Sequence, residues 1–250
     1  MNLSRKEFLN KIKNTQSNQK VANFFIYQPQ NTTVCNNFVG KHSQIVTGYS
    51  NIIVDDDSIY DNLFDNIQYF QNKYHRDANI ISFAIQKTVL DYYGIGRPSE
   101  EFEKILFLKT QYDKGQNTSI KQLKGKRWAT CMERSGLAYN LFRSLGYHCA
   151  LIATDISLVN ENCGHTFIVV ELDNDYYIYD LICSKIYDKD MPSPLLCKLN
   201  KEIGKSIING VIPSNFDLKN INFKTQSNTE KTITYHFYKT KNNEVENERN

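Results

Sequence analysis

A segment near the middle of the chain carries both a start signal and a stop signal for a helix, and it constrains the fold most. Thr130-Cys131-Met132-Glu133 has the S/T-x-x-E form of a capping box. Gly146 is typical of the residue that follows a helix. The sequence therefore predicts a helix over 131–145 in which Cys131 is the first residue. Its apolar stripe consists of Leu137, Ala138, Leu141, Phe142 and Leu145.

Short segments of alternating hydrophobicity follow this helix and predict an antiparallel sheet. The expected strands are 147–154, 165–172, 176–182 and 231–239. Asp173-Asn174-Asp175 has the composition of a hairpin turn. If Asp173-Asn174 is a two-residue turn, His165 and Asp180 become diagonal neighbours on one face of the sheet. A register slip of one residue would place them on opposite faces.

The N-terminal half is expected to be mainly helical, so the chain belongs to the α+β class. Helical periodicity or start and stop signals predict helices over 3–14, from about 58, over 78–93 and from Pro98 through Phe107. A brief strand is expected at 52–54, and loops at 28–45, 110–125 and 155–164. We predict a single domain over 1–250. It comprises a helical part at about 1–110, a helix-and-sheet part at about 120–240 and a frayed tail at about 241–250.

The composition argues against several classes of protein. A chain of 250 residues that is 40% hydrophobic can bury one sizeable core. The net charge of +3 is spread among scattered lysines, so no nucleic-acid partner is predicted. No apolar run is long enough to cross a bilayer, and the N-terminus lacks the apolar region of a signal peptide. We expect a cytoplasmic protein, and export as an effector without a cleaved signal remains open.

The cysteines predict free thiols and neither a disulfide scaffold nor a metal site. The six cysteines are at 35, 131, 149, 163, 183 and 197, and none forms a C-x-x-C pair. A small secreted scaffold would be denser in cysteine. The competing interpretation is a zinc site made of Cys149, Cys163, His165 and Cys183. The spacing of Cys163 and His165 is too tight for a typical pair of ligands, so we predict no metal and no other cofactor.

Cys131, His165 and Asp180 form a candidate set of nucleophile, base and orienting acid. The free N–H groups and dipole at a helix N-terminus lower the pKa of a thiol such as Cys131. In such a set the thiolate attacks a carbonyl, the imidazole carries the proton and the carboxylate fixes the imidazole tautomer. Taken singly, each residue is more often structural, because a lone cysteine is commonly part of the core. A catalytic role for any of the three therefore requires that the fold bring all of them together.

These segments resemble the transglutaminase-like superfamily of papain-like Cys-His-Asp enzymes. The likeness lies in Trp128 to Ala138 with Leu145-Gly146-Tyr147, in His165 to Val169, and in Tyr179-Asp180, and it covers about residues 120–185. The resemblance implies a nucleophile helix packed on an antiparallel sheet. It also implies that Cys131 is the nucleophile, His165 the base and Asp180 the orienter. Gln122 and Trp128, which lie upstream, are the candidates for a second oxyanion donor or a substrate contact.

The superfamily includes proteases, amidases or deamidases and transglutaminases, so the resemblance implies thiol-dependent acyl transfer on amide bonds of proteins or peptides. Two alternatives stay open, an arylamine N-acetyltransferase-like enzyme and a non-catalytic binding module. Glu133 matches the acetyltransferases, but Lys126-Arg127-Trp128 does not supply their paired glycines. The zinc-binding C-x-x-C pair of peptide N-glycanases is absent from the sequence.

Overall fold

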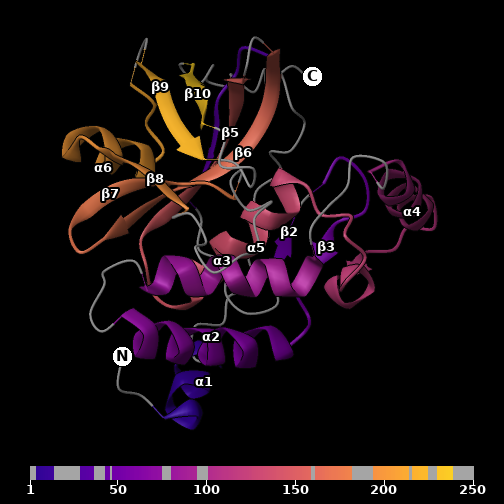
Figure 1. Ribbon diagram of the computed structural model, residues 1–250. Helices are drawn as coiled ribbons and strands as arrows, with labels where there is room; N and C mark the ends of the chain where they lie inside the picture. Colours follow the sequence, from indigo (N-terminus) through magenta and orange to yellow (C-terminus); the bar gives the residue numbers. More distant parts are fainter. Residues whose placement is uncertain are drawn as a thin grey trace, which may run out of the picture.

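The chain forms a mixed α+β structure in which helices and a curled sheet lie in layers (Figure 1). The computed structural model describes residues 4–13, 29–36, 43–45, 47–74, 80–94, 101–158, 161–181, 194–213, 216–224 and 230–238. In Figure 1 the sheet lies above, and the long helices of the N-terminal half lie below it with α5 between. The predicted α+β class is confirmed. The frayed tail expected at about 241–250 lies outside the described residues.

The helices follow the apolar periodicity of the sequence closely. They are α1 (Arg5–Lys13), α2 (Ser58–Tyr74), α3 (Ile80–Tyr93), α4 (Glu101–Asp113), α5 (Cys131–Ser144) and α6 (Lys201–Ile208), with a short 3-10 turn, η2 (Ile120–Leu123). Helix α5 stops where expected, because Gly146 adopts a φ of 87° that other residues rarely take. The predicted end of α4 at Phe107 was wrong, since the buried Leu108 continues its inward side.

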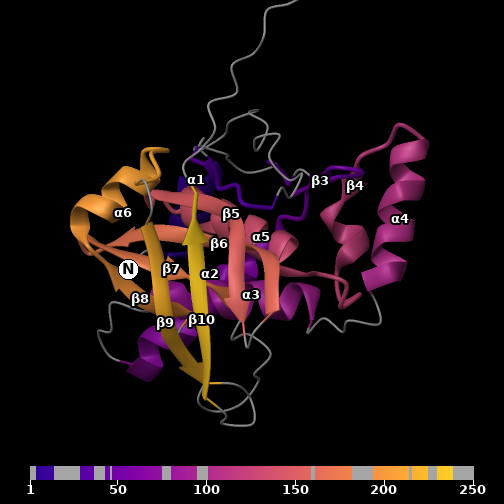
Figure 2. The ribbon, with the colours of Figure 1, turned by 90° about the horizontal axis from the view of Figure 1, so that it is seen from above.

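One sheet dominates the structure, and each of its pairings is antiparallel. Its strands are β1 (Thr33–Cys35), β5 (Cys149–Leu158), β6 (Glu161–Leu172), β7 (Asp175–Tyr179), β8 (Leu195–Leu199), β9 (Phe216–Lys224) and β10 (Glu230–Phe237). Their order is β8-β7-β6-β5-β10-β9, with β1 also paired to β5. Strand β8 contacts β9, so the sheet curls until its two ends approach one another, as Figure 2 shows from above.

Three segments predicted to be loops contain paired strands. Residues 155–164 are mostly strand, because β5 runs on to Leu158 and β6 begins at Glu161. Within 28–45, β1 pairs with β5, and β2 (Gln44–Ile45) pairs with β3 (Ile52–Ile53). Within 110–125, β4 (Thr118–Ser119) pairs with β3, and Ile120 and Leu123 are buried. Strands β1 to β4 are only two or three residues long, which is too short to show a period, so only the tertiary pairing reveals them.

The main sheet has a hydrophobic core on each face. One core joins α5 and the helices below it to the sheet residues Leu151, Ile168 and Val170. The other lies inside the curl and contains Ile152, Phe167, Tyr235 and the residues of α6 that face them. Helix α6 sits against Tyr176 at Gly204, where a Cβ atom would lie only 2.2 Å from the Tyr176 Cβ.

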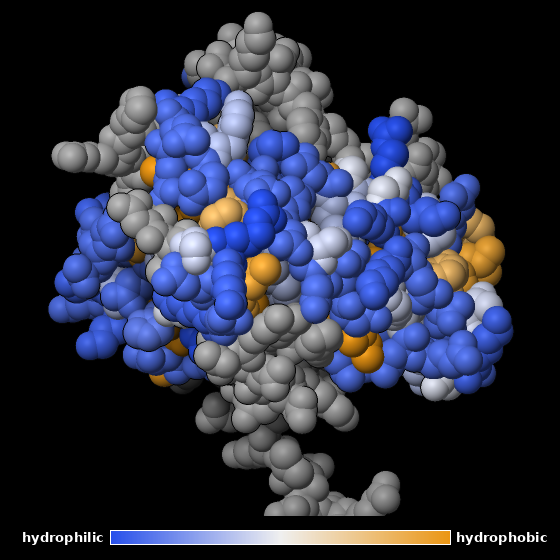
Figure 3. All heavy atoms as spheres, turned by 90° about the horizontal axis from the view of Figure 1, so that it is seen from below, coloured by the Kyte–Doolittle hydropathy of each residue, from blue (hydrophilic) through white to orange (hydrophobic). Residues whose placement is uncertain are grey.

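Helix α4 stands apart from the rest of the helical layer and exposes apolar side chains. Phe102 is 74% exposed and Leu106 is 57% exposed, one helical turn apart. Figure 3 shows an apolar patch at the right-hand edge of the molecule, the side on which α4 lies in Figure 1.

Candidate active site

The N-terminus of α5 places Cys131 at the start of a helix, as the sequence predicts. The Thr130 N–H donates to the Glu133 Oε2 at 2.8 Å, and the Thr130 hydroxyl donates to the same oxygen at 2.8 Å. The first of these bonds is one half of the capping box of α5, and in the other half the Glu133 N–H donates to the Thr130 side chain. Cys131 is therefore the first helical residue, and its half-buried thiol lies where the helix dipole favours an anion.

A buried ion pair lies directly behind this helix start. The Lys104 Nζ, from α4, is 3.2 Å from the Glu133 Oε1 and donates to the Thr130 hydroxyl oxygen at 3.1 Å. The two side chains are only 6% and 0% exposed. Burial opposes ionisation of Glu133, but the charge of Lys104 and the hydrogen bonds from Thr130 outweigh it, so the pKa of Glu133 is lowered. Glu133 is predictable from the sequence as a cap, whereas no local pattern marks Lys104 as its partner.

The β6–β7 hairpin brings His165 and Asp180 together. Leu172 pairs with Asp175 across a turn in which Asp173 and Asn174 have φ angles of 52° and 66°. Both angles are positive, as a tight hairpin turn of this length requires. The predicted register is confirmed, and the His165 Nε2 lies 2.7 Å from the Asp180 Oδ2.

His165 is the link between the carboxylate and the thiol. Burial disfavours the imidazolium, but the charge and hydrogen bond of Asp180, together with contacts to Cys131, raise the pKa of His165 well above its usual value. Burial likewise disfavours the Cys131 thiolate. A hydrogen bond from His165, its charge and the backbone of Thr166 outweigh that cost, so the pKa of Cys131 is lowered. Because Asp180 occupies Nε2, Nδ1 is the ring nitrogen left for the thiol.

Tyr235 is a site residue that the sequence analysis missed. Its hydroxyl donates to the Asp180 Oδ2 at 2.6 Å, and both side chains are buried. Tyr235 lies on β10, which pairs with β5 two strands away from β7. The alternation of 231–239 predicted the strand, but a single sequence holds no signal for which strand β10 would join.

The ring of Phe167 packs against one face of the His165 imidazole. Its ring stacks on that of His165 with centroids 6.2 Å apart and an angle of 21° between the planes. Tyr235 packs edge-on against the same phenyl ring at 4.7 Å. His165 and Tyr235 therefore both pack on the ring of Phe167, which limits how far either side chain can rotate.

The two candidate oxyanion donors lie on the segment that leads into α5. Gln122 belongs to η2, where its Oε1 accepts a hydrogen bond from the Ser119 N–H, so its amide folds back on that turn. Trp128 is half-buried and packs on Phe107 with ring centroids 5.5 Å apart. The Lys126 Nζ lies 5.7 Å from the centre of the indole. These contacts assign both side chains a structural part, and a role in binding the oxyanion stays a prediction.

The strand register separates two members of the alternative zinc site. His165 lies opposite Thr154 near the middle of β5, whereas Cys149 is the first residue of that strand, five residues away. Five residues of strand span about 17 Å, so Cys149 and His165 cannot share one ion. The fourth member, Cys183, lies outside the described residues. Over the ranges that the structure describes, no group of three or more His, Cys, Asp or Glu side chains is arranged to hold a metal.

Comparison with known proteins identifies no relative of this chain. No protein family, curated protein or solved structure matches the chain. Among the described residues, no helix has both the length and the apolar character needed to cross a membrane. The five described cysteines are free thiols, two of them buried, and Cys163 is exposed.

Proposed function

We propose that the chain is a thiol-dependent acyl-transfer enzyme with a transglutaminase-like arrangement, in which Cys131 is the nucleophile. The observation that carries the proposal is the continuous chain of contacts from the α5 N-terminus through His165 to the buried Asp180. A helix bearing the thiol, a strand bearing the base and an acid directly after a second strand occur in the order that the family resemblance implies. This order supports the proposal.

The chemistry proposed for this set has two half-reactions. The Cys131 thiolate attacks the carbonyl carbon of an amide, and the imidazolium of His165 donates its proton to the leaving nitrogen. Water or an amine then attacks the thioester, His165 takes the proton of that nucleophile, and Cys131 leaves as the thiolate. Asp180 keeps the ring oriented throughout. A protein or peptide amide is the substrate class that the resemblance implies.

Alkylation of the native protein tests the proposal before any substrate is known. A limiting amount of iodoacetamide at pH 6, followed by mapping of the labelled peptides, should modify Cys131 first. Cys163 is the internal control, because it is more exposed than Cys131 but burial raises the pKa of its thiol. Labelling governed by exposure alone would modify Cys163 first.

A variant of His165 distinguishes a Cys131 thiol that is activated from one that is only accessible to the reagent. His165→Ala should abolish the preference for Cys131 at pH 6, because the thiolate loses the imidazolium that stabilises it. Selective labelling that depends on His165 would be followed by assays of peptide glutamine with water and with a primary amine as acceptor. A Cys131 that labels no faster than Cys163, or that ignores the loss of His165, would favour the non-catalytic binding module.

A further inference from the structure

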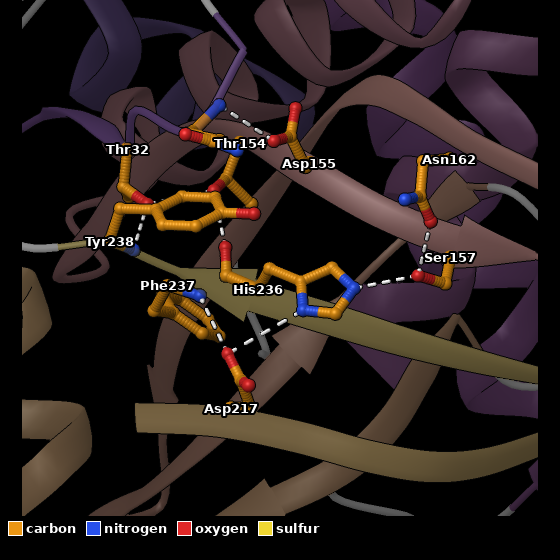
Figure 4. Close-up of polar contacts among 10 residues, drawn as sticks. Thr32, Thr154, Asp155, Ser157, Asn162, Asp217, His236, Phe237 and Tyr238 are labelled. Atoms are coloured by element: carbon orange, nitrogen blue, oxygen red, sulfur yellow. Dashed lines mark hydrogen bonds and ion pairs between the residues drawn. The ribbon is translucent and has the colours of Figure 1, made fainter. Parts of the chain in front are cut away.

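A row of polar side chains crosses four neighbouring strands on one face of the main sheet (Figure 4). Ser157 on β5 lies opposite Asn162 on β6 and opposite Thr234 on β10. His236 is two residues beyond Thr234 and lies opposite Asp217 on β9. Residues that are opposite, or two apart along a strand, share a face. Asp217, His236, Ser157 and Asn162 therefore line up across β9, β10, β5 and β6.

The order of groups along this row is that of an activated hydroxyl, with a close contact at the serine and a looser one at the carboxylate. The Ser157 Oγ is 2.7 Å from the His236 Nε2, and the His236 Nδ1 is 3.6 Å from the Asp217 Oδ1. A serine nucleophile needs the hydroxyl on one ring nitrogen and the carboxylate on the other, as occurs here. On its other side, the Ser157 hydroxyl donates to the Asn162 Oδ1 at 2.6 Å.

This row is separate from the site of Cys131. His165 lies opposite Thr154, which is three residues from Ser157 along β5. An odd separation places Ser157 and Thr154 on opposite faces, about 10 Å apart along the strand. The row also remains open to solvent, since the side chains of His236 and Asp217 are 24% and 35% exposed.

We propose that Ser157 is a second nucleophile of this chain, activated by His236 and Asp217, and that this site cleaves carboxylic esters. The Ser157 oxygen forms a bond to the ester carbon while its proton passes to the His236 Nε2. The alcohol leaves with that proton, which gives an acyl-serine. Water then attacks the acyl carbon while His236 accepts its proton. The bond from that carbon to the serine oxygen breaks, the carboxylic acid leaves, and His236 returns the proton to the serine oxygen.

Asn162 completes the site through a half-turn of its amide. With Nδ2 toward Ser157, the amide becomes a donor, and the serine proton is then free to face His236. The same N–H can donate to the negative oxygen of the tetrahedral intermediate. Esters fit better than amides because their leaving alcohol needs less protonation, and because a half-exposed Asp217 3.6 Å from the ring supports the base only weakly.

The test uses full-length protein in which Cys131→Ala removes the other nucleophile. Diisopropyl fluorophosphate should label Ser157, and peptide mapping should locate the adduct. His236→Gln keeps a side chain that can hydrogen-bond to Ser157 but removes the base, so labelling should slow by at least about 100-fold. Asp217→Asn should slow it by no more than about fivefold, as expected for a weak ion pair. Hydrolysis of p-nitrophenyl acetate should fall in parallel.

Ser206 is the matched control, because its exposed hydroxyl donates to the Val211 carbonyl oxygen and not to a histidine. Ser206→Ala should leave labelling and ester hydrolysis unchanged. No adduct on Ser157, or equal labelling of Ser157 and Ser206, would overturn the proposal. So would a labelling rate that His236→Gln leaves unchanged at an unaltered melting temperature, because the row would then only link the strands. If the glutamine variant does not fold, preferential labelling of Ser157 over Ser206 in the parent decides.

Discussion

One carboxylate oxygen of Asp180 contacts two other residues of the candidate active site. The Asp180 Oδ2 receives the His165 Nε2 at 2.7 Å and the Tyr235 hydroxyl at 2.6 Å. Asp180 is only 1% exposed, so these contacts take over part of the solvation that water would give the carboxylate. The position of the His165 imidazole therefore depends on β10, which carries Tyr235 but contributes neither the thiol nor the imidazole.

Asp180→Asn should shift the pH dependence of Cys131 alkylation. The Asp180 charge raises the pKa of His165, so its removal lowers that pKa and depletes the imidazolium near neutral pH. The pKa of Cys131 should then rise, and each unit of that rise lowers reactivity about tenfold on the acid side. Alkylation rates between pH 5 and pH 9 check this, with near-ultraviolet circular dichroism as a control for folding. An unshifted profile would separate Asp180 from the thiol.

Tyr235→Phe should slow alkylation of Cys131 at pH 7, though less than Asp180→Asn does. The substitution removes a hydrogen bond to the buried carboxylate that orients His165, so the imidazole is held less firmly against the thiol. Hydrogen bonds to charged groups contribute about 1.5–3 kcal/mol to stability. Tyr179→Phe is the matched control. The Tyr179 hydroxyl is buried beside Asp180 and makes no hydrogen bond to the described part of the chain. Equal effects of the two substitutions on the alkylation rate would remove Tyr235 from the site.

Cys131, His165 and Asp180 can be predicted from short sequence patterns, whereas Tyr235 cannot. Cys131 is marked by a capping box, and His165 and Asp180 are joined by one short hairpin whose turn residues fix the register. Tyr235 is 55 residues from Asp180, and β7 and β10 are not neighbours in the sheet. No local pattern encodes a contact of that kind.

At the scale of elements, the start of α5 depends on a charge supplied by another helix. Glu133 is held by Lys104 of α4 as well as by its own cap. Because the folded pKa of Glu133 is lowered, its contribution to stability is present above the unfolded value of about 4.3. That contribution is lost as the pH falls through the lower, folded value.

Lys104→Met should destabilise the protein by about 3–5 kcal/mol, because it leaves the Glu133 carboxylate buried without its partner. The double variant Lys104→Met/Glu133→Leu should recover part of that loss, although it also removes the cap. Urea unfolding at pH 7 measures both free energies. Lys109→Met, on the exposed side of the same helix, should change stability by less than about 0.5 kcal/mol. A similar small change for Lys104→Met would show that Glu133 is neutralised in another way.

Strand β9, which was not predicted from the sequence, breaks its own periodicity. In β9 the apolar residues are Phe216 and Leu218, then Ile221 and Phe223, so the alternation changes phase. The change coincides with Asn220, whose φ is 58°, and with a register shift in the pairing with β10. A bulge of this kind keeps apolar side chains on the inner face while it disrupts the pattern by which strands are recognised.

At the scale of the whole molecule, each face of the main sheet contributes to a hydrophobic core, and the later strands of the sheet close the second core. Deletion of residues 214–250 removes β9 and β10, and with them Phe223, Ile233, Tyr235 and Phe237 of that core. The truncated chain should lose cooperative urea unfolding and the selective alkylation of Cys131. Lys219→Ala in the full chain, an exposed change on β9, is the control and should unfold as the parent does. A sharp transition with an unchanged midpoint in the truncated chain would show that the second core is dispensable.

The α+β class, most helices and the β6–β7 hairpin follow from local patterns, whereas the curl of the sheet does not. The curl brings β8 against β9, which are the two ends of the sheet and belong to separate parts of the sequence. The family resemblance stays a prediction, and it covers the local motifs of about residues 120–185 and not the strands that close the sheet.

The position of Tyr235 on β10 has a consequence for the order in which the molecule is made. A ribosome synthesises Cys131, His165 and Asp180 well before it reaches the residue that donates to the Asp180 carboxylate. The nascent chain can form the helix and the hairpin early, but the hydrogen-bond network around the thiol closes only after β10 has emerged and joined β5. The assembled arrangement is therefore a late event in biosynthesis, and an incomplete chain carries these residues without the contact that fixes them.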